Sequence, residues 1–293
     1  MENQAFLVLG ATGRTGSRVA AGLRQRGMRV RARSRSTTPG FDWHDRTTWA
    51  PALDGVTAAY LVAPQQISMR MDDADQNKTS GFDPEPLARF SRLAASSGVR
   101  HLVLLSGRTA LSGSHFMLDL EEAVQNSGAE WTVLRPGSFA QNFVTDPFRQ
   151  SIIAGTHQEF DTGGRAQDFI DVADIAEVAV RVLTTPGHEQ AVYELSGPEA
   201  LTGKEAAEII GRTLGREIEY SEASADTWAE QARAQGLSDE AVAFTLSAVT
   251  SMRDGYFEPH DGVQKVLGKE PRRFEDFVLE AAAAGAWGPV HPD

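Results

Sequence analysis

A glycine-rich turn directly follows the first apolar run of this chain, and it constrains the fold more than any other feature. Residues 5–9 read AFLVL, a continuous apolar run that is typical of a strand buried in a parallel sheet. The glycines that follow have GxxGxxG spacing, and residues 14–26 then carry apolar side chains on one helical face. A strand, a glycine turn and a helix in this order indicate a domain that binds a dinucleotide.

Each glycine has its own physical task in such a turn. Gly10 permits the tight turn, Gly13 lets the backbone approach a pyrophosphate, and Gly16 lets the helix pack closely against the sheet. The amides at the start of the helix then face the phosphates, where the helix dipole favours negative charge. The cofactor contacts that we expect in this turn are Gly10, Thr12, Gly13, Arg14, Thr15 and Gly16.

The residues that end the second expected strand favour NADP over NAD. An NAD site would place an acidic side chain there to bind the ribose 2′-hydroxyl, but the first acid after this strand is Asp42. The chain has Arg33, Ser34 and Arg35 instead, and an arginine fork suits the geometry of a 2′-phosphate. Arg14 in the glycine turn is expected to reach the same group. The sequence therefore predicts NADP as the cofactor.

Strand and helix patterns alternate along the rest of the first half. Residues 28–33 look like a second strand, and further strands are predicted over residues 58–62, 101–105 and 131–134. Helical patterns separate these runs, and Asp83-Pro84 is typical of a helix start, with an N-cap residue before proline. The alternation predicts an α/β fold with a Rossmann-type, doubly wound parallel sheet, in which ligands bind at the carboxyl ends of the strands.

The pattern changes in the second half, which divides the chain into two expected domains. Residues 1–135 are assigned to an NAD(P)-binding Rossmann domain, and residues 168–190 return to it. Within the returning segment, Asp171 is a plausible N-cap for an amphipathic helix. Residues 136–293 are assigned mostly to a smaller, mainly helical substrate domain, in which a capping box at 202–205 opens one helix.

Composition and charge argue against several other classes of protein. The net charge of −12 argues against nucleic acid or an anionic membrane surface as a partner. The chain has no cysteine and no HExxH motif, so we expect neither disulfides, nor thiolate catalysis, nor a metal. The first apolar run is too short for a signal peptide, and no apolar stretch reaches about 18 residues. We therefore expect a cytoplasmic protein.

Several segments together resemble the NmrA-like atypical short-chain dehydrogenases/reductases. The segments are GATGRTG, FDWHD, GVTAAYLVAP, VRHLVLLSG, SGAEWTVLRPGSFAQNF and YELSGPEALTGKEAAEIIGRTLGR. The resemblance runs from residue 5 to about residue 216 and continues weakly toward the C-terminus. It is closest to bacterial relatives of ergot-alkaloid reductases of the festuclavine synthase and agroclavine dehydrogenase type. The chain is also similar to NADPH quinone reductases and triphenylmethane-dye reductases.

The resemblance implies a cleft between the two domains and further cofactor contacts at the ends of later strands. It implies that Asp42 and Trp43 lie near the adenine, and that Ser106 and Gly107 lie near the nicotinamide. The other residues that it implies along the cofactor or at the pocket mouth are Val62, Ala63, Pro64, Pro136 and Phe139.

The tyrosine–lysine pair with which ordinary short-chain dehydrogenases move a proton is absent from the sequence. The residues four positions after the tyrosines, Tyr60, Tyr193, Tyr220 and Tyr256, are proline, glycine, serine and histidine. An iminium ion already carries the positive charge that a ketone gains only on protonation, so its reduction needs no general acid. A quinone or a cationic dye is similarly electrophilic. Positioning against the nicotinamide would then supply most of the catalysis.

Few polar residues remain as catalytic candidates. His115 is the best proton donor by residue type, although a lone histidine in a loop also fits a solvated or structural role. Ser106 is the second candidate, because the resemblance implies that it lies near the nicotinamide. Asp119, Glu121 and Glu122 are expected on a solvated helix face, with at most one of them turned toward the cleft.

The sequence leaves three functions open. The favoured one is an NADPH-dependent reductase of a small electrophilic substrate, of the iminium or quinone type. The alternatives are a non-catalytic, NADP(H)-sensing regulator, and an isomerase or cyclase in which the cofactor is structural. A pocket lined by Phe139, Phe143 and Trp228 would favour an enzyme, whereas a flat apolar patch would favour partner binding. We expect a monomer or a homodimer that binds a small-molecule substrate.

Overall fold

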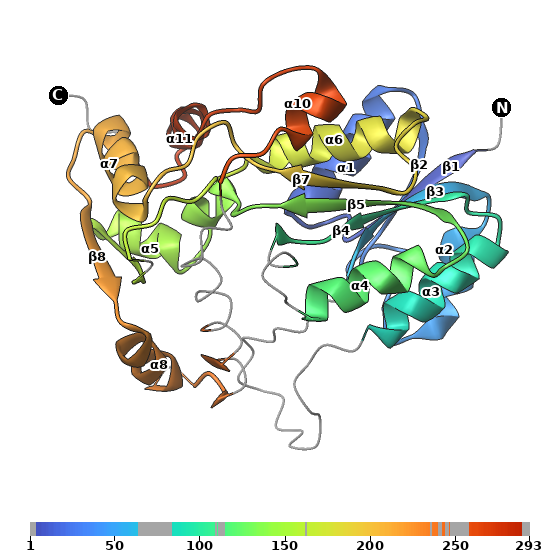
Figure 1. Cartoon of the computed structure of the whole chain (residues 1–293), viewed down its shortest axis with the longest axis horizontal. Coiled ribbons are helices and arrows are strands. Elements are labelled where there is room, and N and C mark those ends of the chain that lie inside the picture. The colour runs from blue at the N-terminus through green and yellow to red at the C-terminus, as the bar shows by residue number, and fades with distance from the viewer. Residues whose placement is uncertain are drawn as a thin grey trace.

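The computed structural model shows an α/β layer joined to a second group of helices that carries the C-terminus (Figure 1). It describes residues 4–63, 84–108, 110, 115–161, 163–234, 236–239, 242–243, 246 and 258–288. Among these residues, no helix is both long enough and apolar enough to cross a lipid bilayer.

Six parallel strands form the main sheet within the described part of the chain. Their order is β2-β1-β3-β4-β5-β7. The order reverses between β1 and β3, which is the place where ligands bind in sheets of this kind. The predicted doubly wound parallel sheet is therefore confirmed. The strands are β1 (Ala5–Leu9), β2 (Arg29–Arg33), β3 (Val56–Val62), β4 (His101–Leu105), β5 (Glu130–Pro136) and β7 (Ala191–Leu195).

Helices cover both faces of this sheet, because the strands are apolar on both sides. On one face, Leu23 and Ile175 pack with Val8 of β1 in one buried cluster. On the other face, Phe90 and Leu120 pack with Leu104 of β4 in a second cluster. The first face carries α1 (Arg14–Gln25), α6 (Val172–Thr184) and α10 (Gly262–Leu267), and the second carries α2 (Trp49–Leu53), α3 (Glu85–Ser96) and α4 (His115–Gln125).

The second group of elements has its own core, in which Phe143 packs against Phe169 and Phe274. Two short strands, β6 and β8, pair in parallel there. The sequence analysis did not predict them, because THQEF and EYSEA lack the apolar run of a buried strand. The elements are η3 (Ala140–Val144), α5 (Phe148–Ile153), β6 (Thr156–Phe160), α7 (Gly203–Leu214), β8 (Glu219–Ala223), α8 (Ala225–Ala234) and α11 (Phe274–Ala283).

Two of the three expected helix starts agree with the structure, and the third helix begins one residue later than expected. The Asp171 carboxylate accepts a hydrogen bond from Ala173 N as the N-cap of α6, and the capping box that opens α7 is present. Helix α3 begins at Glu85 with Pro84 in the N-cap position, while Asp83 lies outside the described residues. The returning segment was expected to end at residue 190, but β7 also joins the main sheet.

A buried amide joins the two groups of elements where α6 begins. Gln141 of η3 donates a hydrogen bond to the Asp171 carboxylate (2.9 Å) and accepts one from Val172 N (3.0 Å). The adjoining backbone is also paired, since Ala140 N donates to Ile170 O (2.9 Å) and Ile170 N donates to Ser138 O (2.8 Å). These bonds fix the chain that leaves β5 against the start of α6.

The glycine turn brings α1 against the end of β1. Gly10 adopts φ +65°, a left-handed conformation that glycine adopts without strain. A Cβ at Gly16 would overlap the Gly10 carbonyl and lie 3.1 Å from Leu9 O. The missing side chain at Gly16 therefore permits the close packing of helix on strand.

We predict that Gly16→Ala lowers the free energy of unfolding of the cofactor-free protein by at least about 2 kcal/mol, because the new methyl group meets backbone atoms that cannot move aside. Urea denaturation followed by circular dichroism measures this loss. Gly13→Ala is the matched control, since its Cβ would meet only Gly10 O at 3.2 Å. Equal losses in both variants would contradict the packing role of Gly16.

Candidate cofactor and substrate site

A pocket of about 900 Å³ runs along the carboxyl ends of strands β1 to β5. Neighbouring strands lie about 4.8 Å apart, so this edge extends roughly 19 Å from β2 to β5 and suits an elongated ligand. Most of the expected cofactor contacts line it. They are Gly10, Thr12, Gly13, Arg14, Thr15, Ser34, Arg35, Asp42, Trp43, Val62, Ala63, Ser106, Gly107, Pro136 and Phe139.

Four expected residues do not line the pocket or lie outside what the structure describes. Gly16 packs beneath the turn, against Gly10. Arg33 is absent from the pocket wall, and its Nη1 donates a hydrogen bond to Ala32 O (3.1 Å). Pro64 lies outside the described residues. His115 is the first residue of α4, but its side chain is outside the described part of the chain.

The start of α1 can hold a negatively charged group. Its N-cap residue, Gly13, has no side chain to accept hydrogen bonds from the first amides, and no acidic residue stands in the first turn. Thr12, Gly13 and Thr15 line the pocket at this point. Uncapped amides at the positive end of a helix dipole fit a pyrophosphate.

Arg14 is engaged on the β5 side of the pocket and not at the end of β2. Its Nη1 donates to Asn142 Oδ1 (2.7 Å), and its guanidinium lies 5.0 Å from the centre of the Phe139 ring. Burial lowers the pKa of Arg14 from its ordinary value. Arg14 therefore joins the glycine turn to η3, which differs from its expected place beside Arg35.

The end of β2 supplies the opposite wall. Ser34, Arg35 and Ser36 line the pocket there, and the Ser34 and Ser36 hydroxyl oxygens lie 3.2 Å apart. The turn is held by hydrogen bonds from Ser34 N to Thr37 Oγ1 (2.9 Å) and from Phe41 N to Ser34 O (3.0 Å). One guanidinium and two hydroxyl groups thus stand where a dinucleotide places its adenosine ribose.

At the other end of the pocket, Ser106 lies over a buried carboxylate. Its hydroxyl donates to Glu121 Oε1 (2.6 Å), and Arg135 donates to the same carboxylate through Nε (2.9 Å) and Nη2 (2.6 Å). Glu121 is 2% exposed, so the expectation that it is solvated is wrong. Ser106 and Arg135 compensate its burial. The hydrogen bonds to Glu121 raise the pKa of Arg135.

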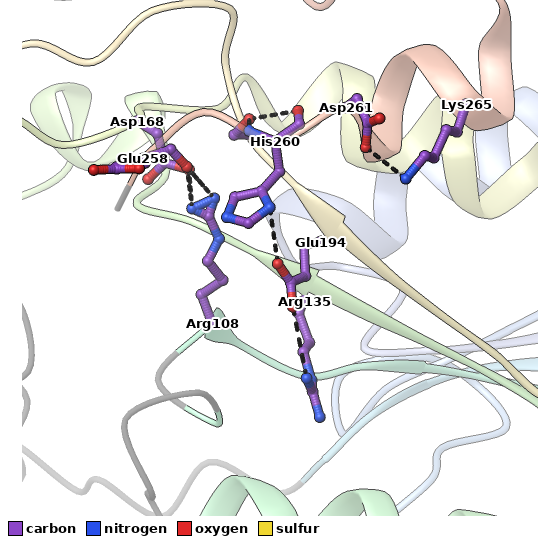
Figure 2. A network of polar contacts seen from close by, with 9 residues as sticks. Arg108, Arg135, Asp168, Glu194, Glu258, His260, Asp261 and Lys265 are labelled. Atoms are coloured by element: carbon purple, nitrogen blue, oxygen red, sulfur yellow. Dashed lines mark hydrogen bonds and ion pairs between the residues drawn. The ribbon is translucent and has the colours of Figure 1, made fainter. Parts of the chain in front are cut away.

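A second buried ion pair stands beside Ser106. Arg108 lines the pocket and donates to Asp168 Oδ2 through Nη1 (2.6 Å) and Nη2 (2.5 Å), and to Glu258 O (2.8 Å). Figure 2 shows the Arg108 guanidinium pointing at Asp168 and Glu258. A Cβ at Gly137 would lie 2.5 Å from Asp168 Oδ1, so the glycine leaves room for this carboxylate. Burial raises the pKa of Asp168 to about 7, and Arg108 partly opposes this shift.

The sequence analysis missed Arg108, Asp168 and the part that Glu121 plays. Arg108 and Asp168 are sixty positions apart, and no local pattern links them. The one signal for Arg108 is its place directly after Ser106 and Gly107, at the end of a buried strand. Phe143 is buried in the second core and Trp228 packs against a separate small cluster, so of the three expected aromatic residues only Phe139 lines the pocket.

The chain matches a family model described as NAD(P)H-binding over residues 10–186. It is 34% identical to the uncharacterized oxidoreductase YesF of Bacillus subtilis, with 98% of each chain covered. It is 32% identical to agroclavine dehydrogenase of Claviceps fusiformis, over 94% of this chain and 96% of that protein. The structure resembles an NADPH-dependent quinone oxidoreductase from Escherichia coli complexed with NADPH, with a TM-score of 0.75 and 21% identity over 94% of this chain and 99% of that one. At that identity the resemblance shows the fold.

We predict that Asp168 makes the protein less stable as the pH rises. Its pKa is raised by folding, from 3.8 to about 7, so the folded state binds the proton more tightly than the unfolded state. The free energy of unfolding should therefore fall, by up to about 4 kcal/mol, as the pH rises from 3.8 through 7, and then level off.

Denaturant titrations from pH 4 to pH 8 on the wild type and Asp168→Asn measure this contribution as the difference between the two pH slopes. The Asp168→Asn variant cannot titrate at this position, so its stability should fall less with pH. Asp119→Asn is the control, because Asp119 is an exposed carboxylate on α4. Identical slopes for the wild type and Asp168→Asn would refute the assignment.

Proposed function

The chain belongs to the NAD(P)H-binding family, among the NmrA-like atypical short-chain dehydrogenases/reductases, and we propose that it is an NADPH-dependent reductase of a small electrophilic substrate. Its relatives establish it as an NAD(P)H-dependent oxidoreductase. The preference for NADPH over NADH is a proposal, and so is the assignment of an iminium ion or a quinone as the substrate. The single observation that carries them is one continuous pocket from Arg35 to Ser106.

The preference for NADPH rests on the wall beside β2. Arg35 offers a charged fork, and Ser34 and Ser36 offer hydroxyl donors, at the place where a 2′-phosphate would lie. The only acidic residue among the described residues of this pocket is Asp42, which follows the turn and accepts a hydrogen bond from His44 N (2.9 Å). Arg33 stays a candidate contact from the sequence, although it does not line the pocket.

The remaining site residues have roles that follow from their places. The amides of the glycine turn would hold the pyrophosphate, which directs the nicotinamide half toward the ends of β4 and β5. NADPH, when bound, supplies the hydride. Ser106, Gly107 and Phe139 would shape the wall against which that ring and the substrate lie. His115 stays a proposed proton donor, on the strength of its residue type alone.

An electrophile that needs no general acid during hydride transfer fits this site better than a ketone. The described wall of the pocket contains no tyrosine and no lysine. Positioning of the acceptor over the nicotinamide would therefore supply most of the catalysis, as expected for an iminium ion or a quinone. The exposed large apolar residues of the described chain come from four separate elements, α4, α5, β7 and α11, and so do not favour the regulator alternative.

The proposal is tested by following NADPH oxidation by absorbance with a panel of cyclic iminium ions, quinones and cationic dyes. We expect turnover of at least one class at a rate that depends on enzyme concentration. Tight NADPH binding with no turnover across the whole panel would reject the reductase and favour the sensing regulator.

We predict that Arg35→Asp weakens NADPH binding at least about tenfold and changes NADH binding by less than about threefold, since only NADPH carries the 2′-phosphate. Fluorescence titration of both cofactors measures the two affinities. Arg26→Asp is the control with the same change in charge, because Arg26 is exposed where α1 ends, at the opposite edge of the sheet. A tenfold loss for both cofactors would exclude the 2′-phosphate as the ligand of Arg35.

A further inference from the structure

The Ser106 hydroxyl donates its hydrogen to another side chain of the protein. Glu121 Oε1 lies 2.6 Å from Ser106 Oγ, and an ionised carboxylate can only accept, so the hydroxyl is the donor. Among the described residues, the other acceptor near this hydroxyl is Met117 Sδ at 3.9 Å, which is much weaker. The backbone amide of Ser106 is also engaged, because it donates to Leu134 O (2.8 Å). Ser106 therefore presents lone pairs to the pocket and no hydrogen.

The buried Glu121 carboxylate is paired with one guanidinium group and one hydroxyl group. The Arg135 guanidinium donates two hydrogen bonds to the carboxylate, at 2.9 and 2.6 Å, in the forked geometry that suits this pair. The Arg135 side chain is only 15% exposed and also lies 3.8 Å from Glu194. Since the acceptor is charged and fixed on two sides, the Ser106 hydroxyl is held in one orientation.

The charged groups around this end of the pocket are paired with one another, and burial raises the pKa of Asp168 to about 7, so they leave no fixed negative excess. The described network contains three carboxylates, Glu121, Asp168 and Glu194, and two guanidinium groups, Arg108 and Arg135. Both guanidinium groups are engaged by protein acceptors, and His260 Nδ1 lies 2.9 Å from Glu194 Oε2 on the far side (Figure 2). A preference for a cation at this end would therefore come from the Ser106 lone pairs and not from a net charge.

We propose that Glu121 is a positioning residue that makes Ser106 a hydrogen-bond acceptor, and that this arrangement selects cationic substrates over neutral ones. The inference rests on the proposed reductase function. In the favoured reaction, hydride adds to the carbon of a C=N⁺ bond, the π electrons of that bond move to nitrogen, and a neutral amine and NADP⁺ result. No proton is consumed. A quinone takes up a hydride and also a proton on oxygen, which Ser106 does not supply.

The role of Glu121 predicts a change in substrate preference when its charge is removed. In Glu121→Gln the side chain has one acceptor oxygen, which Arg135 claims, while the amide NH₂ can donate to Ser106 Oγ. The Ser106 hydroxyl would then be free to donate into the pocket. We expect kcat/KM for a cationic acceptor to fall at least about tenfold and kcat/KM for a quinone to change less than about threefold.

The experiment compares NADPH oxidation by the wild type, Glu121→Gln, Ser106→Ala and Glu122→Gln, each with a cyclic iminium ion and with menadione. Glu122→Gln is the matched control, because Glu122 is the exposed neighbour on the same helix, and both of its values should stay within about twofold. Ser106→Ala removes the acceptor oxygen without burying a new group, so it should also lose the cationic substrate selectively. The Ser106→Ala variant therefore still tests the proposal if Glu121→Gln does not fold.

A binding measurement provides a readout that is independent of turnover. Titration of the cofactor-free protein with a cationic triphenylmethane dye, followed by its absorbance shift, should give weaker binding to Glu121→Gln than to the wild type. Equal loss of both acceptors, or unchanged dye binding, would overturn the role of Glu121 and leave the reductase standing. Absence of wild-type turnover with every acceptor would reject the proposed function and this inference with it.

Discussion

The close approach of α1 to the end of β1 is the constraint on which the site depends. Gly16 packs where a side chain would overlap the Gly10 carbonyl, and Gly10 turns the chain in a left-handed conformation. Together they place the uncapped amides of α1 at the reversal point of the strand order. The pocket then extends in both directions along the sheet edge, toward Arg35 on one side and Ser106 on the other.

Much of this could be predicted from the sequence, because the signals are local. The strand, turn and helix of the first 25 residues are contiguous. The later strands that end at the pocket are short apolar runs, apart from β2, which alternates arginine with apolar residues. The ends of those runs therefore point to Ser34, Val62 and Ser106 as residues at the site edge. The short pair β6 and β8 could not be found in this way, since neither strand is apolar.

The buried charged groups at the site could not be predicted from the sequence, for a different reason. Glu121 is acidic and lies between Leu120 and Glu122 on an amphipathic helix, where a charge is normally solvated. It is buried because Ser106 and Arg135, fifteen and fourteen residues away, both donate to it. A tertiary contact overrides the local pattern here, and the same holds for Arg108 with Asp168. One sequence does not show which charges will meet.

The amide clamp at Gln141 sets how this protein can diversify. Gln141 joins η3 to the first turn of α6, and the backbone from Ser138 to Ala140 is hydrogen-bonded to the chain beside it. These hydrogen bonds hold the pocket wall at Phe139 to the main sheet, whereas the buried apolar residues of α8 belong to a separate small cluster. The sequence of that outer helix can therefore change without disturbing the pocket wall at Phe139.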